Sequence, residues 1–119
     1  MEDFGRQAEN LVVSALLGRG YRILARNFRG PRYEIDIVAS MRDAMVVVEV
    51  KMRSGDWIAA DLIPYQKRLA LMRGGRAAWN RFRSPEHAAI RLDVALVGRD
   101  DGQLKLKNYF ADVAWANNR

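Results

Sequence analysis

The sequence contains no cysteine and only one histidine, His87. The lack of cysteine excludes a disulfide scaffold, a thiolate zinc site and a cysteine nucleophile. A single histidine excludes a histidine-based metal cluster or catalytic triad. His87 follows Ser84, Pro85 and Glu86 in a predicted loop, so we expect it to be exposed to solvent.

Long apolar runs are also missing. The longest, residues 44–48, is far shorter than the roughly 20 residues that cross a bilayer. The acidic start, Met1-Glu2-Asp3, has no signal-peptide core. We therefore expect a cytoplasmic protein that does not enter a membrane. The length of 119 residues predicts one domain, residues 1–119, large enough to bury a core without disulfides.

Positive charge is plentiful and unevenly distributed. Twenty basic residues, sixteen of them arginine, face fourteen acidic ones, which gives a net charge of +6. Residues 19–33 hold five arginines and no acid, and residues 64–83 hold six basic residues and no acid. Residues 34–63, between them, hold six acids and three bases. This pattern indicates a polyanionic partner, nucleic acid before a membrane surface, because the arginine fork matches phosphate.

Periodicity predicts an α/β domain of the order αβββαββ. The expected helices cover residues 2–18 and 64–82, with a further short helix at 111–116. The expected strands cover residues 21–29, 33–39, 44–52, 90–97 and 103–110. Gly74 and Gly75 fall inside the second helix, where each glycine costs about 1 kcal/mol relative to alanine. Either that helix packs very closely there or it breaks.

The second and third strands carry the most informative residues. Asp36 and Glu49 pair directly if the positions of facing residues sum to 85, and Glu34 then faces Lys51. A slip of one residue would put the two sets on opposite faces. The alternate apolar residues would then form one buried face: Ile35, Ile37, Val46, Val48 and Val50.

Two facing carboxylates repel each other unless something neutralises them. Mg²⁺ or Mn²⁺ would do so, since hard cations bind carboxylates, water and substrate phosphate. Lys51, two residues from Glu49, could orient or deprotonate a water molecule, and phosphodiester hydrolysis would follow. The alternative is a charged solvent face held by a Glu34–Lys51 ion pair.

Five motifs in the same order are similar to one family and cover nearly the whole chain. They are GRQAE at 5–9, GYRILARN at 20–27, EIDIVA at 34–39, VVEVKMR at 47–53 and RLDV at 91–94. They resemble the small bacterial YraN-like proteins, relatives of archaeal Holliday junction resolvases in the PD-(D/E)XK nuclease superfamily. The resemblance implies a restriction-endonuclease-like αβββαβ core with a mixed central sheet flanked by helices.

The resemblance also implies roles for individual residues. Asp36 and Glu49 match the metal-binding acids, Lys51 matches the catalytic lysine, and Glu9 matches the acid of the first helix. We further expect the Val50 carbonyl to assist in holding the metal. Gln66 or Lys67 falls at the polar position of the next helix. The family usually has glycine before EID, whereas this chain has Tyr33, which would narrow the approach to the site.

The leading hypothesis is a metal-dependent endonuclease that acts on DNA, at branched or flapped structures. Enzymes that cut junctions commonly act as dimers, so a homodimer is a further expectation. The expected nucleic-acid contacts are Arg26, Arg29, Arg32, Arg53, Trp57, Lys67 and Arg68. Two other classes stay open: a non-catalytic nucleic-acid-binding module on this fold, and a basic adaptor for an acidic protein or a membrane surface. We expect Asp93 to form an ion pair with Arg91 rather than to bind a metal.

Overall fold

A computed structural model describes residues 3–113. The elements are α1 (Phe4–Gly18), β1 (Arg22–Gly30), β2 (Tyr33–Met41), β3 (Ala44–Met52), α2 (Ala59–Leu62), α3 (Tyr65–Phe82), β4 (Ala89–Asp100) and β5 (Gln103–Phe110). The predicted α/β order is confirmed, with α2 as an additional short helix. The five strands form one mixed sheet in the order β1-β2-β3-β4-β5.

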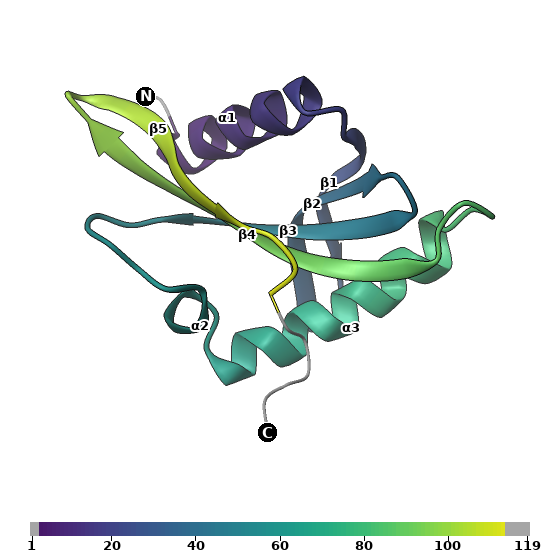
Figure 1. The fold of residues 1–119 in the computed structure, drawn as a ribbon. Coiled ribbons are helices and arrows are strands. Elements are labelled where there is room, and N and C mark those ends of the chain that lie inside the picture. Colours follow the sequence, from purple (N-terminus) through teal and green to yellow (C-terminus); the bar gives the residue numbers. More distant parts are fainter. Residues whose placement is uncertain (1–2, 114–119) are drawn as a thin grey trace.

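The sheet lies between two helical layers, with α1 on one face and α3 on the other (Figure 1). Only β3 and β4 run parallel, and the remaining neighbours are antiparallel. A parallel pair needs a long crossover connection, which here contains α2 and α3. Both faces of the central strands are therefore buried, as the unbroken valine run of β3 indicates.

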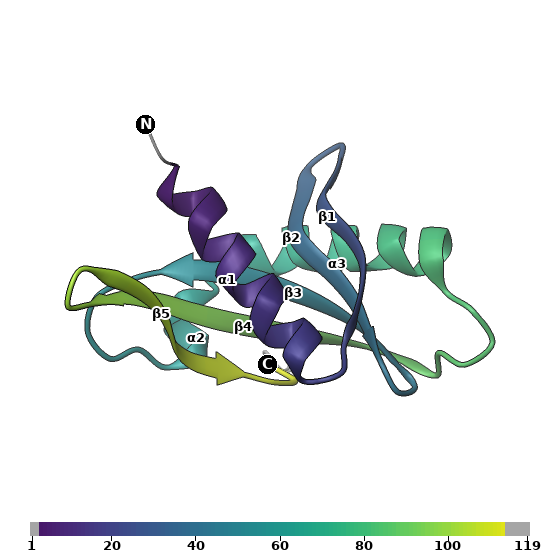
Figure 2. The ribbon, with the colours of Figure 1, turned by 90° about the horizontal axis from the view of Figure 1, so that it is seen from above.

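Helix α1 begins at a side-chain cap. The carboxylate of Asp3 accepts hydrogen bonds from the backbone N–H groups of Gly5 (2.9 Å) and Arg6 (3.3 Å), which have no partner within the helix. Ala8, Val12 and Leu16 recur at helical spacing and are buried against the sheet. The cap and the apolar stripe together fix how α1 lies across the sheet, as Figure 2 shows from above.

The predicted register of the β2–β3 hairpin is confirmed. Met41 faces Ala44 at the turn and Ile37 faces Val48 at the far end, so each pair sums to 85. The ladder ends at that last pair, one step before Asp36 and Glu49. The two carboxylates thus stand where the strands begin to separate.

The prediction that Ile35 and Ile37 share one buried face is wrong. Ile37 packs in the cluster beneath α1, whereas Ile35 packs in the cluster beneath α3. The pairs on either side of this point, Arg26↔Ile37 and Phe28↔Ile35, place Asn27 opposite Asp36. Asn27 has a left-handed backbone, with φ of 51°, and this irregularity interrupts the alternation of side chains in the sheet.

Helix α3 does not break at its paired glycines, because the sheet approaches it very closely there. A Cβ added to Gly74 would lie 2.7 Å from Cδ1 and 2.9 Å from Cγ1 of Ile35. Tyr33 also points to this helix, with Cδ1 3.1 Å from the same position. The cost of glycine in the helix is offset by the closer packing of α3 on β2.

Two further predictions are corrected. The side chain of His87 is only 1% exposed, not open to solvent: Nε2 lies 2.8 Å from Oγ of Ser40, and Nδ1 accepts from the backbone N–H of Ser84 at 3.1 Å. These two bonds pull the loop before β4 onto the sheet.

Residues 111–113 are not helical, and the rest of the predicted C-terminal helix lies outside the described residues. Within residues 3–113, no helix combines the length and apolar character needed to cross a membrane.

Candidate active site

Asp36 is the first acid of the site and is tied to the neighbouring strand. Its Oδ2 accepts a hydrogen bond of 2.7 Å from the backbone N–H of Val50 on β3. Burial, reinforced by the nearby Glu49 carboxylate, raises the pKa of Asp36 to about 6, although the Val50 bond and Lys67 oppose the shift. The site therefore opposes ionisation of Asp36 unless positive charge is added.

Glu49 is the second acid, and it is only 3% exposed. Its Oε2 lies 3.2 Å from Nζ of Lys51 on the same strand and 3.4 Å from Nζ of Lys67 on α3. Its Oε1 is buried and has no hydrogen-bond partner. A buried carboxylate oxygen without a partner is costly, so this atom has unused capacity to bind a donor or a cation.

These two acids fit a hard divalent cation. Mg²⁺ usually takes one or two protein carboxylates and fills its remaining positions with water and substrate oxygens. Asp36 and Glu49 supply two carboxylates, the nearby Glu49 carboxylate helps to raise the pKa of Asp36, and Oε1 of Glu49 is unpartnered. Among residues 3–113 no group of three acidic or histidine side chains comes together. Water and substrate would have to supply most of the remaining ligands.

Glu9 lies on the α1 side of the same region. Its side chain is 13% exposed, and its Oε1 accepts from Nη2 of Arg26 (3.2 Å) and from Nδ2 of Asn27 (3.3 Å). Glu9 and Asp36 line one open cavity of about 680 Å³, together with Arg6, Arg26, Arg29 and Val50. The structure thus brings Glu9 to the cavity of Asp36, but with its carboxylate already paired.

The β1–β2 hairpin carries two further predicted phosphate contacts. Arg29 lines the cavity and pairs with Glu34 at 3.2 Å, with both side chains largely exposed. The prediction that Glu34 faces Lys51 is wrong, because the β2–β3 ladder ends before that pair and Glu34 turns to β1. Arg32 forms the turn with φ of 64°, and its carbonyl accepts from Arg73 of α3 at 3.4 Å.

The beginning of α3 resolves the choice between Gln66 and Lys67. Lys67 contacts Glu49, whereas Gln66 is exposed on the first turn of the helix. Arg68 is turned inward: it donates to the Ile63 carbonyl at 3.2 Å, and its Nε is buried without a partner. Lys67, but not Gln66, therefore contacts an acid of the site in this structure.

Arg53 and Trp57 lie together after β3. The guanidinium of Arg53 stands 5.9 Å from the centre of the Trp57 ring and donates to the Met52 carbonyl. The indole N–H of Trp57 donates to the Ser54 carbonyl at 2.9 Å, and the residue is 37% exposed. This pair presents a cation and an aromatic face to solvent. Tyr33, at the position where the family usually has glycine, packs on Phe28 with 5.7 Å between the ring centres.

Sequence reasoning missed Asn27 and Arg6 as parts of this region. Asn27 reaches Glu9 only because its backbone is left-handed, and Arg6 reaches the cavity from the first turn of α1. Asparagine is enriched at positive φ, so an asparagine inside a predicted strand is the one signal that could have marked this irregularity. No signal in the sequence identified Arg6.

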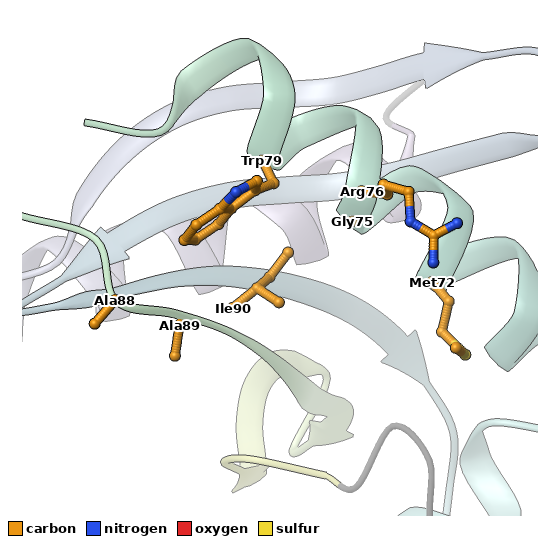
Figure 3. A pocket seen from close by; sticks show the side chains of 7 residues that line it. All are labelled: Met72, Gly75, Arg76, Trp79, Ala88, Ala89 and Ile90. Atoms are coloured by element: carbon orange, nitrogen blue, oxygen red, sulfur yellow. The ribbon is translucent and has the colours of Figure 1, made fainter. Parts of the chain in front are cut away.

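The structure also contains a second buried acid, Asp93, and a separate cavity. Asp93 is fully buried and satisfied: as predicted it pairs with Arg91 (2.9 Å), and it also accepts from Tyr109 and from the backbone N–H of Asp112. A separate cavity of about 440 Å³ lies between α3 and the start of β4 (Figure 3). It is lined by Met72, Trp79, Ile90 and other residues, none of them acidic.

Together, fold and site define a small α/β domain with a five-stranded mixed sheet, in which the half-buried Asp36 lies near the buried Glu49 and two lysines contact Glu49. The chain belongs to UPF0102, described as an uncharacterised protein family, whose profile matches residues 8–97. That stretch includes Glu9, Asp36, Glu49, Lys51 and Lys67.

Individual relatives match most of the chain. The UPF0102 protein of Chlorobium phaeobacteroides strain BS1 is 39% identical over 101 residues, which cover 82% of this chain and 79% of the relative. That of Methylorubrum populi is 38% identical over 106 residues, covering 89% and 85%. That of Bradyrhizobium sp. is 41% identical over 96 residues, covering 78% and 68%.

Proposed function

We propose that this protein is a divalent-metal-dependent endonuclease that hydrolyses phosphodiester bonds of DNA. In this proposal its relatives are the YraN-like proteins and the Holliday junction resolvases of the PD-(D/E)XK superfamily, and branched DNA is the substrate class. The observation that carries the proposal is Glu49, whose Oε2 meets two lysines while its buried Oε1, in the neighbourhood of Asp36, has no partner. A buried carboxylate oxygen without a partner is costly, which favours a ligand for this atom.

Each residue has a distinct part in this proposal. Asp36 and Glu49 would hold Mg²⁺ or Mn²⁺, with the Val50 carbonyl and Glu9 as the expected further ligands. When bound, such a cation polarises the phosphoryl oxygen and acidifies a water molecule. Lys51, 3.2 Å from Glu49, orients the attacking water at the edge of the acid pair. Lys67 of α3, 3.4 Å from Glu49, balances the charge of that acid.

The basic side chains around the site bind the substrate backbone. Arg29 lines the cavity that contains Asp36, and Arg53 follows Lys51 by two residues, just after the end of β3. Arginine binds phosphate through two parallel hydrogen bonds, which suits a backbone that must be held in one register. Arg32 lies farther along the β1–β2 hairpin and would extend this contact.

One observation favours a second candidate, a nucleic-acid-binding module without catalysis. Glu49 already has two ammonium neighbours, Lys51 at 3.2 Å and Lys67 at 3.4 Å, as in an ion pair that only stabilises the fold. Such a protein would bind DNA with the same arginines and would not cleave it.

Nuclease assays with purified protein distinguish the two candidates. Labelled four-way junction, duplex and single-stranded DNA are incubated with Mg²⁺ or Mn²⁺. We expect cleavage by the wild type and a loss of about 100-fold or more in Asp36→Asn, Glu49→Gln and Lys51→Ala, in line with the removal of groups that act on the reacting atoms. Asp101→Asn, in the β4–β5 turn, is the matched control, since asparagine tolerates the same positive φ.

Equal cleavage by the wild type and the Asp36 variant would identify a contaminant. Tight binding of all three DNAs without cleavage would favour the binding module.

A further inference from the structure

Arg26 holds the carboxylate of Glu9 in a pair that spans two elements. Nη2 of Arg26, on β1, lies 3.2 Å from Oε1 of Glu9 and 2.7 Å from Oδ1 of Asn10, both on α1. Figure 2 shows α1 crossing the sheet beside β1. Glu9 is mostly buried, whereas the Arg26 side chain is 36% exposed. The cationic member of the pair is therefore the one that reaches solvent.

The backbone is specially shaped to make this contact. Successive residues of a strand normally point to opposite faces, yet Arg26 and its neighbour Asn27 both donate to Oε1 of Glu9. The positive φ of Asn27 makes this possible. A non-glycine residue in this region costs free energy, and such strain concentrates at functional sites.

The Glu9–Arg26 pair lines a cavity in which we expect both a divalent cation and a phosphate group to bind. Glu9, Arg26 and Asp36 all line the cavity of about 680 Å³, and Arg6 and Arg29 line it as well. A phosphate entering this cavity would meet three guanidinium groups. A phosphate oxygen would compete with Glu9 for Arg26, since both offer charged oxygens to the same donor.

We propose that Arg26 is a positioning residue that exchanges partners when nucleic acid binds. In the free protein it pairs with Glu9. A backbone phosphate takes over Arg26, and the released carboxylate of Glu9 becomes available to the cation held at Asp36. This inference rests on the proposed function. It adds that DNA and cation bind cooperatively, and that Arg26 couples the two.

Coupling between two ligands is reciprocal, so it can be measured from either side. The first measurement is Mn²⁺ affinity without DNA, by calorimetry. We expect Arg26→Gln to bind Mn²⁺ more tightly than the wild type by about 5- to 150-fold, the usual range of such couplings, because Glu9 is no longer neutralised. Arg26→Lys keeps the positive charge and should restore affinity close to that of the wild type. Adding Glu9→Gln to Arg26→Gln should abolish the gain.

The second measurement is DNA affinity by fluorescence anisotropy, with and without Mn²⁺, in a Lys51→Ala background that prevents cleavage. Mn²⁺ should tighten DNA binding with Arg26 present and should do so much less in Arg26→Gln. Arg22→Gln is the matched control, because Arg22 is also on β1 and pairs at 2.7 Å with a different acid, Glu86. Circular dichroism confirms that each variant is folded.

Three results would decide the matter. Tighter Mn²⁺ binding in Arg26→Gln but not in Arg22→Gln supports the exchange. Unchanged or weaker Mn²⁺ binding in a folded Arg26→Gln, with Asp36→Asn still abolishing binding, overturns the exchange and leaves the cation site intact. No Mn²⁺ binding by the wild type overturns the proposed function and this inference with it.

Discussion

Oδ2 of Asp36 accepts a hydrogen bond of 2.7 Å from the backbone N–H of Val50, just where β2 and β3 leave their common ladder. The bond holds the Asp36 carboxylate against the backbone of β3, near Glu49. Burial and, after it, repulsion from Glu49 together outweigh the stabilisation by this N–H, because the pKa of Asp36 is raised to about 6. The two strands thus hold together two acids that repel each other.

This relationship predicts how Asp36 affects stability. Because its folded-state pKa, about 6, exceeds the ordinary value of 3.8, its contribution to stability is full below pH 3.8 and is lost as the pH rises through 6. Asn cannot ionise. In metal-free buffer, the melting temperature of Asp36→Asn relative to the wild type should therefore rise between about pH 4 and pH 7.5. Asp101→Asn, in an exposed turn, should show no such trend, and a pH-independent difference for Asp36→Asn would contradict this account.

A second prediction concerns the buried carboxylate of Asp93. It accepts from Arg91, Tyr109 and the backbone of Asp112, and burial and Asp93 raise the pKa of Tyr109. Asp93→Ala leaves Arg91 without its acid, so urea denaturation should show a loss of about 3–5 kcal/mol. Tyr109→Phe removes one hydrogen bond and should cost about 1 kcal/mol. Equal losses in the two variants would show that Asp93 is not the centre of this network.

A third prediction tests the close approach of α3 to β2. Gly74→Ala should lower the free energy of unfolding by about 1–2 kcal/mol, because overpacking against Ile35 outweighs the gain in helix propensity. Ile35→Val removes the Cδ1 atom that would clash with the new Cβ, so Gly74→Ala should be less destabilising in that background. Gly18→Ala, where no atom lies within 4 Å of the added Cβ, should not destabilise the protein. Stabilisation by Gly74→Ala would mean that the helix and sheet can move apart at little cost.

A fourth prediction concerns phosphate binding by Arg29. Each phosphate contact contributes about 0.9 to the slope of log affinity against log salt for duplex DNA, so Arg29→Gln should reduce that slope by about one. The control is Arg42→Asn. Arg42 lies in the turn at the opposite end of the β2–β3 ladder, and asparagine tolerates the positive φ of this residue. That variant should keep the wild-type slope. A salt-independent affinity would argue against nucleic-acid binding altogether.

Local patterns in the sequence were sufficient for the order of the elements and for the β2–β3 register, because a hairpin with buried valines tolerates no slip. They could not place Ile35, whose face depends on an irregularity centred on Asn27 in the neighbouring strand. Nor could they show that His87 is buried, since its partner Ser40 is 47 residues away. The pairing of Glu9 with Arg26 could not be predicted for a similar reason. It depends on how α1 crosses the sheet, which is a property of packing rather than of local sequence.

The most direct test of the central claim is a crystal structure of the protein grown with Mn²⁺, with anomalous diffraction used to locate the ion. We expect one anomalous peak bound by carboxylate oxygens of both Asp36 and Glu49, with Oε1 of Glu49 among the ligands, and no peak there in Asp36→Asn crystals. A Mn²⁺-saturated crystal with no ion between these two acids, or with the same peak in the Asp36 variant, would contradict the account.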